Sequence, residues 1–206
     1  MAGGIVAELR PPSVARAATG RYPRGMTDTL WTIGHSTREW SVFVAMLREA
    51  GIATLADVRR FAGSRRHPQF HGAAMAEALP ACGIAYVPMP DLGGRRPPRR
   101  DSPNTAWRHA GFRGYADYMA TAEYAQARER LAATARASPT AILCAEAMWW
   151  QCHRGLVADD FKARGWEVRH LLAPGRVEPH PYTSAARIVD GQLNYAAMAP
   201  PQPDLF

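Results

Sequence analysis

The sequence has almost no lysine, few cysteines and no long hydrophobic run. Lys162 is the only lysine among the 25 Lys and Arg residues, and the three cysteines are Cys82, Cys144 and Cys152. An odd, small number of cysteines excludes a disulfide-rich scaffold. No stretch approaches the roughly 18 apolar residues of a membrane-spanning helix, and no repeat or heptad pattern is present. Membrane-spanning, solenoid and coiled-coil classes are therefore excluded.

What is present is the composition of one globular domain. The chain has 206 residues, 47% of them hydrophobic, and its formal net charge of +7 favours phosphate-bearing partners. We expect residues 1–28 to be a disordered leader, 29–195 a single α/β domain and 196–206 a flexible tail. No continuous apolar segment of a secretory signal precedes residue 26, so we expect a cytoplasmic protein, nucleoid-associated if it binds DNA.

Short apolar runs alternate with helical patterns along the domain. Strands are predicted at 30–34, 52–58, 84–87, 140–145 and 166–172, and helices after residue 36, at 72–82, at 115–137 with a break near Thr121, and at 151–164. This order predicts a three-layer, Rossmann-like parallel sheet of about five strands with helices on both faces. A long loop is predicted at 88–112, and a small C-terminal hairpin at 186–195.

Polar residues follow two strands that such a sheet would bring together. Gly34-His35-Ser36 follows the first strand, and Cys144-Ala145-Glu146 ends the fourth. If the sheet winds outward from the first strand, these two ends flank the topological switch point, where ligands bind. Ser36 and Glu39 have the spacing of a capping box, which predicts Ser36 as a helix N-cap.

Three residues at the ends of predicted strands are candidates for catalysis. Glu146 and Asp57 are carboxylates placed to activate water or to stabilise positive charge, and His35 is placed to contact or protonate a leaving group. The alternative for each carboxylate is structural. Glu146 would then pair with Arg154, and Asp57 with Arg59 or Arg154.

Basic and aromatic residues are candidates for substrate binding. Arginines suit phosphates, while aromatic rings suit a stacked or flipped base. A solvated loop and a hydrophobic lid on the core are the alternatives. The predicted binding residues are Ser36, Arg59, Arg65, Arg66, Phe70, Tyr115, Trp149, Trp150, His153 and Arg154.

A thiol or metal site is a weaker alternative. Cys144, Cys152 and His153, joined by His35, could bind zinc, but the spacing is not that of a C-x2-C site and the ligand set is incomplete. We therefore predict no metal and no cofactor, and interpret Cys144 as a small core residue.

Several motifs together resemble the domain of unknown function 488 family over roughly residues 30–172. They are Thr32-Ile33-Gly34-His35-Ser36, Asp57-Val58-Arg59, Ser64-Arg65-Arg66 with Phe70, Leu92-Gly93-Gly94-Arg95-Arg96, the run 112–119, Cys144-Ala145-Glu146 and Cys152-His153-Arg154. The resemblance implies a bacterial cytoplasmic α/β domain whose site is built from these motifs. It implies little about the chemistry.

The pentapeptide Gln202-Pro203-Asp204-Leu205-Phe206 resembles the bacterial sliding-clamp-binding motif. In that motif two apolar side chains fill a pocket while the glutamine forms a hydrogen bond.

The tail, the basic loops and the switch-point carboxylates together predict an enzyme of DNA repair or modified-base processing. In its most concrete form this enzyme hydrolyses the N-glycosidic bond at a flipped base. A non-catalytic nucleotide- or DNA-binding module is the alternative, and a thiol or zinc enzyme on a small molecule is the third.

The clamp interpretation predicts the outcome of a tail substitution. Leu205→Ala with Phe206→Ala should abolish binding to a purified bacterial sliding clamp, because each apolar anchor is worth about 2 kcal/mol or more. Folding should be unchanged. Equal clamp binding by the wild type and the double variant in a pull-down titration, or binding by neither, would exclude this partner.

Overall fold

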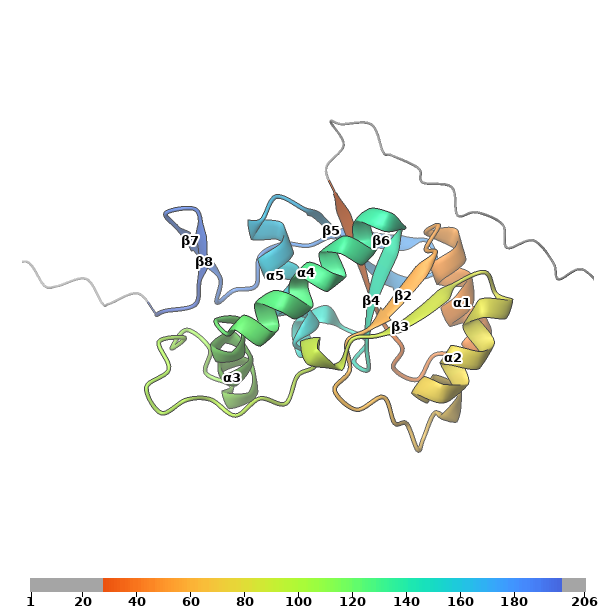
Figure 1. Ribbon diagram of the computed structural model, residues 1–206, viewed down its shortest axis with the longest axis horizontal. Coiled ribbons are helices and arrows are strands. Elements are labelled where there is room, and N and C mark those ends of the chain that lie inside the picture. The colour runs from red at the N-terminus through yellow and green to blue at the C-terminus, as the bar shows by residue number, and fades with distance from the viewer. Residues whose placement is uncertain (1–27, 198–206) are drawn as a thin grey trace, which may run out of the picture.

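The computed structural model describes residues 28–197, and the sheet lies at its centre (Figure 1). The strands are β1 (Thr29–Gly34), β2 (Thr54–Asp57), β3 (Ala85–Pro88), β4 (Thr140–Cys144), β5 (Glu167–Ala173), β6 (Arg176–Pro179), β7 (Arg187–Val189) and β8 (Gln192–Asn194). The α-helices are α1 (Trp40–Glu49), α2 (Gly72–Ala81), α3 (Ala110–Met119), α4 (Ala122–Ala137) and α5 (Arg154–Ala163), with short 3-10 turns η1 (Pro68–Phe70), η2 (Pro90–Leu92) and η3 (Trp149–Gln151). The predicted anchors Gln202, Leu205 and Phe206 lie outside the described residues.

The central sheet confirms the predicted α/β class. Its six strands lie in the order β3-β2-β4-β1-β5-β6, and β7 pairs with β8 as the predicted hairpin. Strands β1 to β5 are parallel, whereas β6 joins the edge antiparallel to β5. The edge strand β6 was not predicted, because most of its residues are exposed and it has no buried apolar run to mark it.

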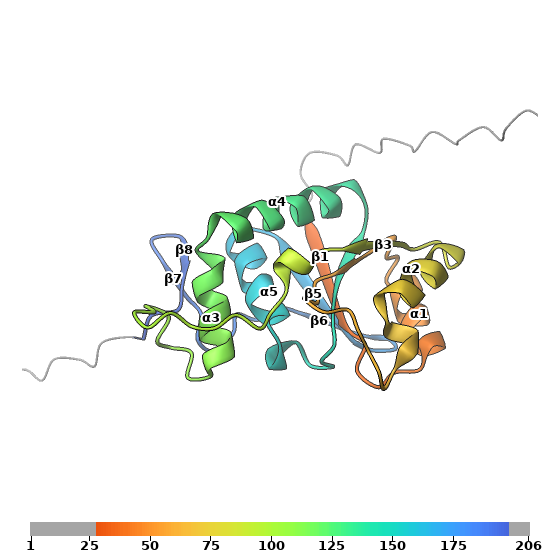
Figure 2. The same cartoon turned by 60° about the horizontal axis from the view of Figure 1, so that its bottom comes forward.

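Two hydrophobic clusters cover the two faces of the sheet. Helices α1 and α2 pack over one face around Phe43, Leu47 and Met75. Helices α3, α4 and α5 pack over the other around Tyr115 and Phe161, and Figure 2 shows the two groups on opposite sides of the sheet. The neighbours β1 and β4 are thus followed by helices on opposite faces, which makes their carboxyl ends the switch point.

The start of α1 differs from the prediction. The helix begins at Trp40, its N-cap is Glu39, and no side chain caps it, so Ser36 is not the N-cap. The N–H groups of His35 and Ser36 instead donate to the carbonyls of Cys144 and Ala145, at 3.1 and 2.8 Å. These bonds extend the pairing of β1 with β4 past the strand ends and delay the helix. By contrast, Thr121 caps α4 as the predicted break requires.

No helix among residues 28–197 combines the length and the apolar character needed to cross a membrane.

A buried hydrogen-bonded chain ties the C-terminal segment to the sheet. Asp159, fully buried on α5, accepts from His180 Nε2 at 3.0 Å and from the Thr183 hydroxyl at 2.6 Å. His180 Nδ1 lies 2.9 Å from His170 Nε2, and His170 Nδ1 lies 2.7 Å from the Thr32 hydroxyl. The chain of contacts therefore runs from the Asp159 carboxylate through both imidazole rings to Thr32 on β1.

This chain predicts a loss of stability in mild acid. Burial, together with His180 and Arg154, lowers the pKa of His170 from 6.5 to about 2. Below pH 6.5 His170 is therefore protonated in the unfolded chain but stays neutral in the folded chain, so the free energy of unfolding falls as the pH falls. We expect this residue to remove about 2 kcal/mol of unfolding free energy between pH 7 and pH 5, measured by urea denaturation.

The matched variant is His170→Gln, which does not titrate. Its unfolding free energy should depend less steeply on pH in the same interval, although it is lower at pH 7. Identical pH slopes in the variant and the wild type would contradict the assignment.

Candidate functional site

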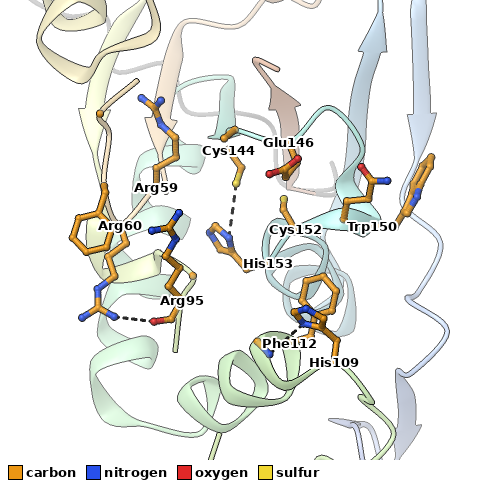
Figure 3. Close-up of a pocket in the computed structure, with 16 residues that line it drawn as sticks. Arg59, Arg60, Arg95, His109, Phe112, Cys144, Glu146, Trp150, Cys152 and His153 are labelled. Atoms are coloured by element: carbon orange, nitrogen blue, oxygen red, sulfur yellow. Dashed lines mark hydrogen bonds between the residues drawn. The ribbon is translucent and has the colours of Figure 1, made fainter. Parts of the chain in front are cut away.

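A pocket of about 710 Å³ opens at the carboxyl ends of β2 and β4 (Figure 3). The segments after these two strands form its floor, and residues of the long loop and of the start of α3 form the opposite wall. The residues that line it are Arg59, Arg60, Phe61, Gly63, Gly94, Arg95, His109, Gly111, Phe112, Cys144, Ala145, Glu146, Trp150, Gln151, Cys152 and His153.

The loop after β4 is held in place by Arg154. This side chain is 1% exposed, and its guanidinium donates to the carbonyls of Glu146 and Ala147 at 2.5 and 2.6 Å. The Glu146 carbonyl in turn lies so close to Gly34 that a Cβ there would be 1.8 Å from the oxygen. Arg154 therefore supports the loop from beneath. It meets the backbone of Glu146 rather than the carboxylate, and it does not line the pocket.

Asp57 and Arg59 form a buried ion pair under the pocket. Asp57 is 1% exposed and accepts from Arg59 Nε at 2.8 Å and from the Tyr86 hydroxyl at 2.7 Å. The second Asp57 oxygen accepts from Arg59 Nη2 at 2.5 Å. Asp57 thus has the structural role that the sequence left open. Arg59 lies between this carboxylate and the pocket that it lines.

His35 is also beneath the pocket. Its ring stacks on Phe70 with centroids 4.5 Å apart, Nδ1 donates to the Ser36 carbonyl, and Nε2 accepts from Arg59 Nη1 at 3.3 Å. Burial lowers the pKa of His35 below 6.5, so the ring is neutral and its lone pair is occupied. The predicted meeting of Glu146, Asp57 and His35 in one cleft is therefore not what the structure has, because only Glu146 lines the pocket.

Glu146 has no side-chain partner among residues 28–197. It is exposed, its carboxylate makes no hydrogen bond or ion pair with them, and it is the only acidic residue that lines the pocket. An unpartnered carboxylate in a pocket rich in arginine is available to accept a proton or to bind a substrate.

Cys144, Cys152 and His153 meet at the floor of the pocket. His153 Nε2 donates to the Val58 carbonyl at 3.0 Å, which directs Nδ1 toward Cys144 Sγ at 3.8 Å. Hydrogen bonding to Cys152 lowers the pKa of the Cys144 thiol well below its ordinary value, and His153 and Arg154 lower it further. The sequence treated Cys144 as a core residue, and it is indeed buried, but its sulfur belongs to a polar cluster.

The other predicted binding residues divide into three groups. Arg59, Trp150 and His153 line the pocket, and Trp150 is 50% exposed. Arg65 and Arg66 are exposed on the loop between β2 and α2, and do not line it. The third group does not line the pocket. Ser36 lies in the turn before α1, Phe70 stacks against His35, and the Tyr115 hydroxyl donates to the Leu92 carbonyl. Trp149 stacks on His170, and Arg154 lies beneath the loop after β4.

Ten of the lining residues were not predicted as site residues. Those with charged, aromatic or imidazole side chains are Arg60, Phe61, Arg95, His109 and Phe112. Phe61 is 65% exposed, and the guanidinium groups of Arg60 and Arg95 lie 5.7 and 5.9 Å from its ring centre. For Phe61 the sequence signal was a large apolar residue beside two arginines in a polar loop, and for Arg95 it was the motif Leu92-Gly93-Gly94-Arg95-Arg96. The approach of Arg95 and His109 to the pocket depends on how the long loop folds back.

The long loop approaches the site closely because it contains two adjacent glycines. A Cβ at Gly93 would lie 2.5 Å from the Arg60 backbone nitrogen, and one at Gly94 would lie 2.8 Å from His153 Nδ1. Tyr115 and Asp117 on α3 anchor the same loop, the first through the Leu92 carbonyl and the second through the Arg99 N–H.

Comparison with known proteins identified one family. The family model described as "Domain of unknown function DUF488" matches residues 39–160, a span that includes the loops from Arg59 to His153. Neither the curated proteins nor the solved structures contained a match.

The buried ion pair predicts a large difference between two Asp→Asn substitutions. Asp57→Asn leaves the Arg59 charge buried without its counter-ion and should lower the unfolding free energy by about 3–5 kcal/mol in urea denaturation. Asp101→Asn is the matched control, because Asp101 pairs with Arg99 where the two side chains are 72% and 61% exposed. The control should lose little stability, because water screens an exposed ion pair. Equal losses would contradict a structural role for Asp57.

Proposed function

The chain belongs to the DUF488 family, and on that premise we propose that the pocket is the active site of a hydrolase that acts on a nucleotide unit of nucleic acid. The proposal rests chiefly on Glu146, the unpartnered carboxylate in a pocket lined by arginines and exposed aromatic rings. This combination supplies one group for proton transfer, several for phosphate and at least two for stacking on a base.

The lining supports an anionic, ring-containing substrate. Arg59, Arg60 and Arg95 supply positive charge, while Phe61 and Trp150 are large aromatic side chains at least half exposed. Two exposed aromatic rings that line one pocket can stack on the π-face of a base. The volume of about 710 Å³ is in the range of small-molecule sites and is sufficient for one nucleotide.

Glu146 is the proposed general base. Its carboxylate would take a proton from water, and the resulting nucleophile would attack carbon while the carbon–nitrogen bond to the leaving group breaks. The proton on Glu146 would then pass to the departing nitrogen. Cleavage of an N-glycosidic bond is one form of this chemistry and removal of an amino group from the base is another. In this mechanism Asp57 and His35 are positioning residues, because they orient Arg59 instead of contacting the substrate.

A polymer substrate is favoured over a free nucleotide by the basic surface beside the pocket. Arg65 and Arg66 are exposed on the loop that begins at Arg59. Their side chains form no hydrogen bond or ion pair with residues 28–197, so their contacts give them no role in the fold. Neighbouring arginines at such a position suit the phosphates that flank a bound nucleotide. A sliding-clamp partner recruited through Leu205 and Phe206 would also place the enzyme on DNA.

The proposal predicts that Glu146→Gln abolishes turnover without abolishing binding. The wild type is incubated with nucleotides and with DNA carrying modified bases, and base release or loss of an amino group is followed by mass spectrometry. Removal of the general base should lower kcat about 10²–10⁴-fold and change Kd little. Glu77→Gln is the matched control, because Glu77 is exposed on α2 and does not line the pocket.

Other outcomes of the same assay would overturn parts of the proposal. Binding without turnover by the wild type would identify a binding module instead of an enzyme. Turnover that Glu146→Gln leaves intact would exclude Glu146 as the base. If DNA is the substrate, Arg65→Ala with Arg66→Ala should reduce the slope of log Kd against log salt concentration for duplex DNA by up to about two, one for each lost phosphate contact. Binding of a mononucleotide should be unchanged.

A further inference from the structure

Three potential metal ligands lie together at the floor of the pocket. The sulfur atoms of Cys144 and Cys152 and a ring nitrogen of His153 are all within 4.8 Å of one another. Around a tetrahedral zinc ion with bonds of about 2.0–2.3 Å, ligand atoms lie somewhat less than 4 Å apart. The 3.8 Å from Cys144 Sγ to His153 Nδ1 already has that value. A small inward movement of Cys152 Sγ would bring all three ligand atoms to the spacing of a zinc site.

The orientation of His153 supports metal binding. Its Nε2 donates to the Val58 carbonyl at 3.0 Å, which leaves Nδ1 unprotonated in the neutral ring and aimed at the sulfur of Cys144. A metal-binding histidine characteristically donates its second ring N–H to a carbonyl or carboxylate in this way. Gly94 keeps space open beside Nδ1, because a methyl group there would lie 2.8 Å from that atom.

The buried Arg154 side chain contacts the sulfur of Cys152. Arg154 is 1% exposed and forms no ion pair with a carboxylate among residues 28–197. Its charged hydrogen bonds go to two neutral carbonyls and, at 3.4 Å, to the sulfur of Cys152. Arg154 Nη1 thus bonds both to the Glu146 carbonyl and to the Cys152 sulfur, which fixes Cys152 at the edge of the cluster.

We propose that Cys144, Cys152 and His153 bind a zinc ion through two thiolate sulfurs and Nδ1, with the fourth position facing the pocket. Two sulfur ligands and one imidazole favour zinc over magnesium or calcium, which prefer oxygen. Three protein ligands with an open position are the arrangement of a catalytic zinc site rather than a structural one.

The ion's catalytic role rests on the proposed function, whereas the binding site does not. Glu146 lines the same pocket as the three ligands. Zinc would make water a stronger acid, Glu146 would accept the released proton, and the oxygen would form a bond to carbon of the substrate. The carbon–nitrogen bond would then break, and the proton on Glu146 would pass to the departing nitrogen. Atoms and charges balance as hydrolysis by one water.

The test uses the full chain, purified under reducing conditions, and needs no substrate. Cobalt(II) replaces zinc as the probe, because thiolate ligation gives an intense charge-transfer absorption and tetrahedral geometry gives strong visible bands. We expect one cobalt per chain, displaced by one equivalent of zinc. Cys144→Ser and Cys152→Ser should each lower the affinity for cobalt by more than about 10–100-fold, which is the loss expected when only a residue that hydrogen-bonds to a metal ligand is replaced.

The chain contains its own matched control. Cys82 is a free cysteine at the end of α2, away from the cluster, so Cys82→Ser should bind cobalt as the wild type does. Gly94→Ala should weaken binding while all three ligands remain, because its methyl group occupies the space beside Nδ1. Circular dichroism verifies that each variant is folded.

A second readout avoids substitutions altogether. Zinc should protect Cys144 and Cys152 of the wild type from alkylation, mapped by mass spectrometry, while leaving Cys82 reactive. No stoichiometric cobalt binding, or equal alkylation with and without zinc, would overturn the proposal. So would a Cys144–Cys152 disulfide that forms reversibly in a protein that binds no metal, because the pair would then be a redox couple. Metal binding without turnover would retain the site and refute only the proposed function.

Discussion

The pocket depends on a buried guanidinium that has no carboxylate partner within the described part of the chain, residues 28–197. Arg154, at the first turn of α5, reaches under the loop after β4 and bonds to two of its carbonyls. The loop can lie there only because Gly34 at the end of β1 has no side chain. One interaction thus places Glu146 at the pocket wall and fixes Cys152 beside Cys144. Both proposals depend on that arrangement.

The site consists of two layers with different roles. The lower layer is closed: Asp57 and His35 accept hydrogen bonds from Arg59, Tyr86 donates to Asp57, and Phe70 stacks on His35. The upper layer is open, with Glu146, Trp150 and Phe61 exposed to the pocket. A buried network that satisfies its own polar groups can hold a charged side chain in one orientation, which is what an anion-binding arginine requires.

The long loop contributes to the site although it contains no regular secondary structure beyond the short turn η2. Two adjacent glycines let its backbone approach Arg60 and His153, and hydrogen bonds to Tyr115 and Asp117 on α3 anchor it. Arg95 therefore reaches a pocket whose other residues come mostly from the ends of strands. Anchored loops of this kind commonly carry functional residues, because a rigid sheet positions them from one side.

The alternation of apolar runs and helical patterns was sufficient to determine the parallel sheet and the switch point, because burial of apolar faces is a property of the local pattern. The C-terminal hairpin, whose strands are largely exposed, was instead indicated by the turn pair Asp190-Gly191. It also placed Glu146, Trp150 and His153 near the site. Only the tertiary structure decided which polar side chains face the pocket. Asp57 and His35 stand at the ends of strands as Glu146 does, yet Arg59, Tyr86 and Phe70 bury both of them, and no local signal distinguishes a paired carboxylate from an unpaired one. Edge strand β6 and the meeting of Cys144 with His153 likewise depend on contacts between segments that sequence patterns treat separately.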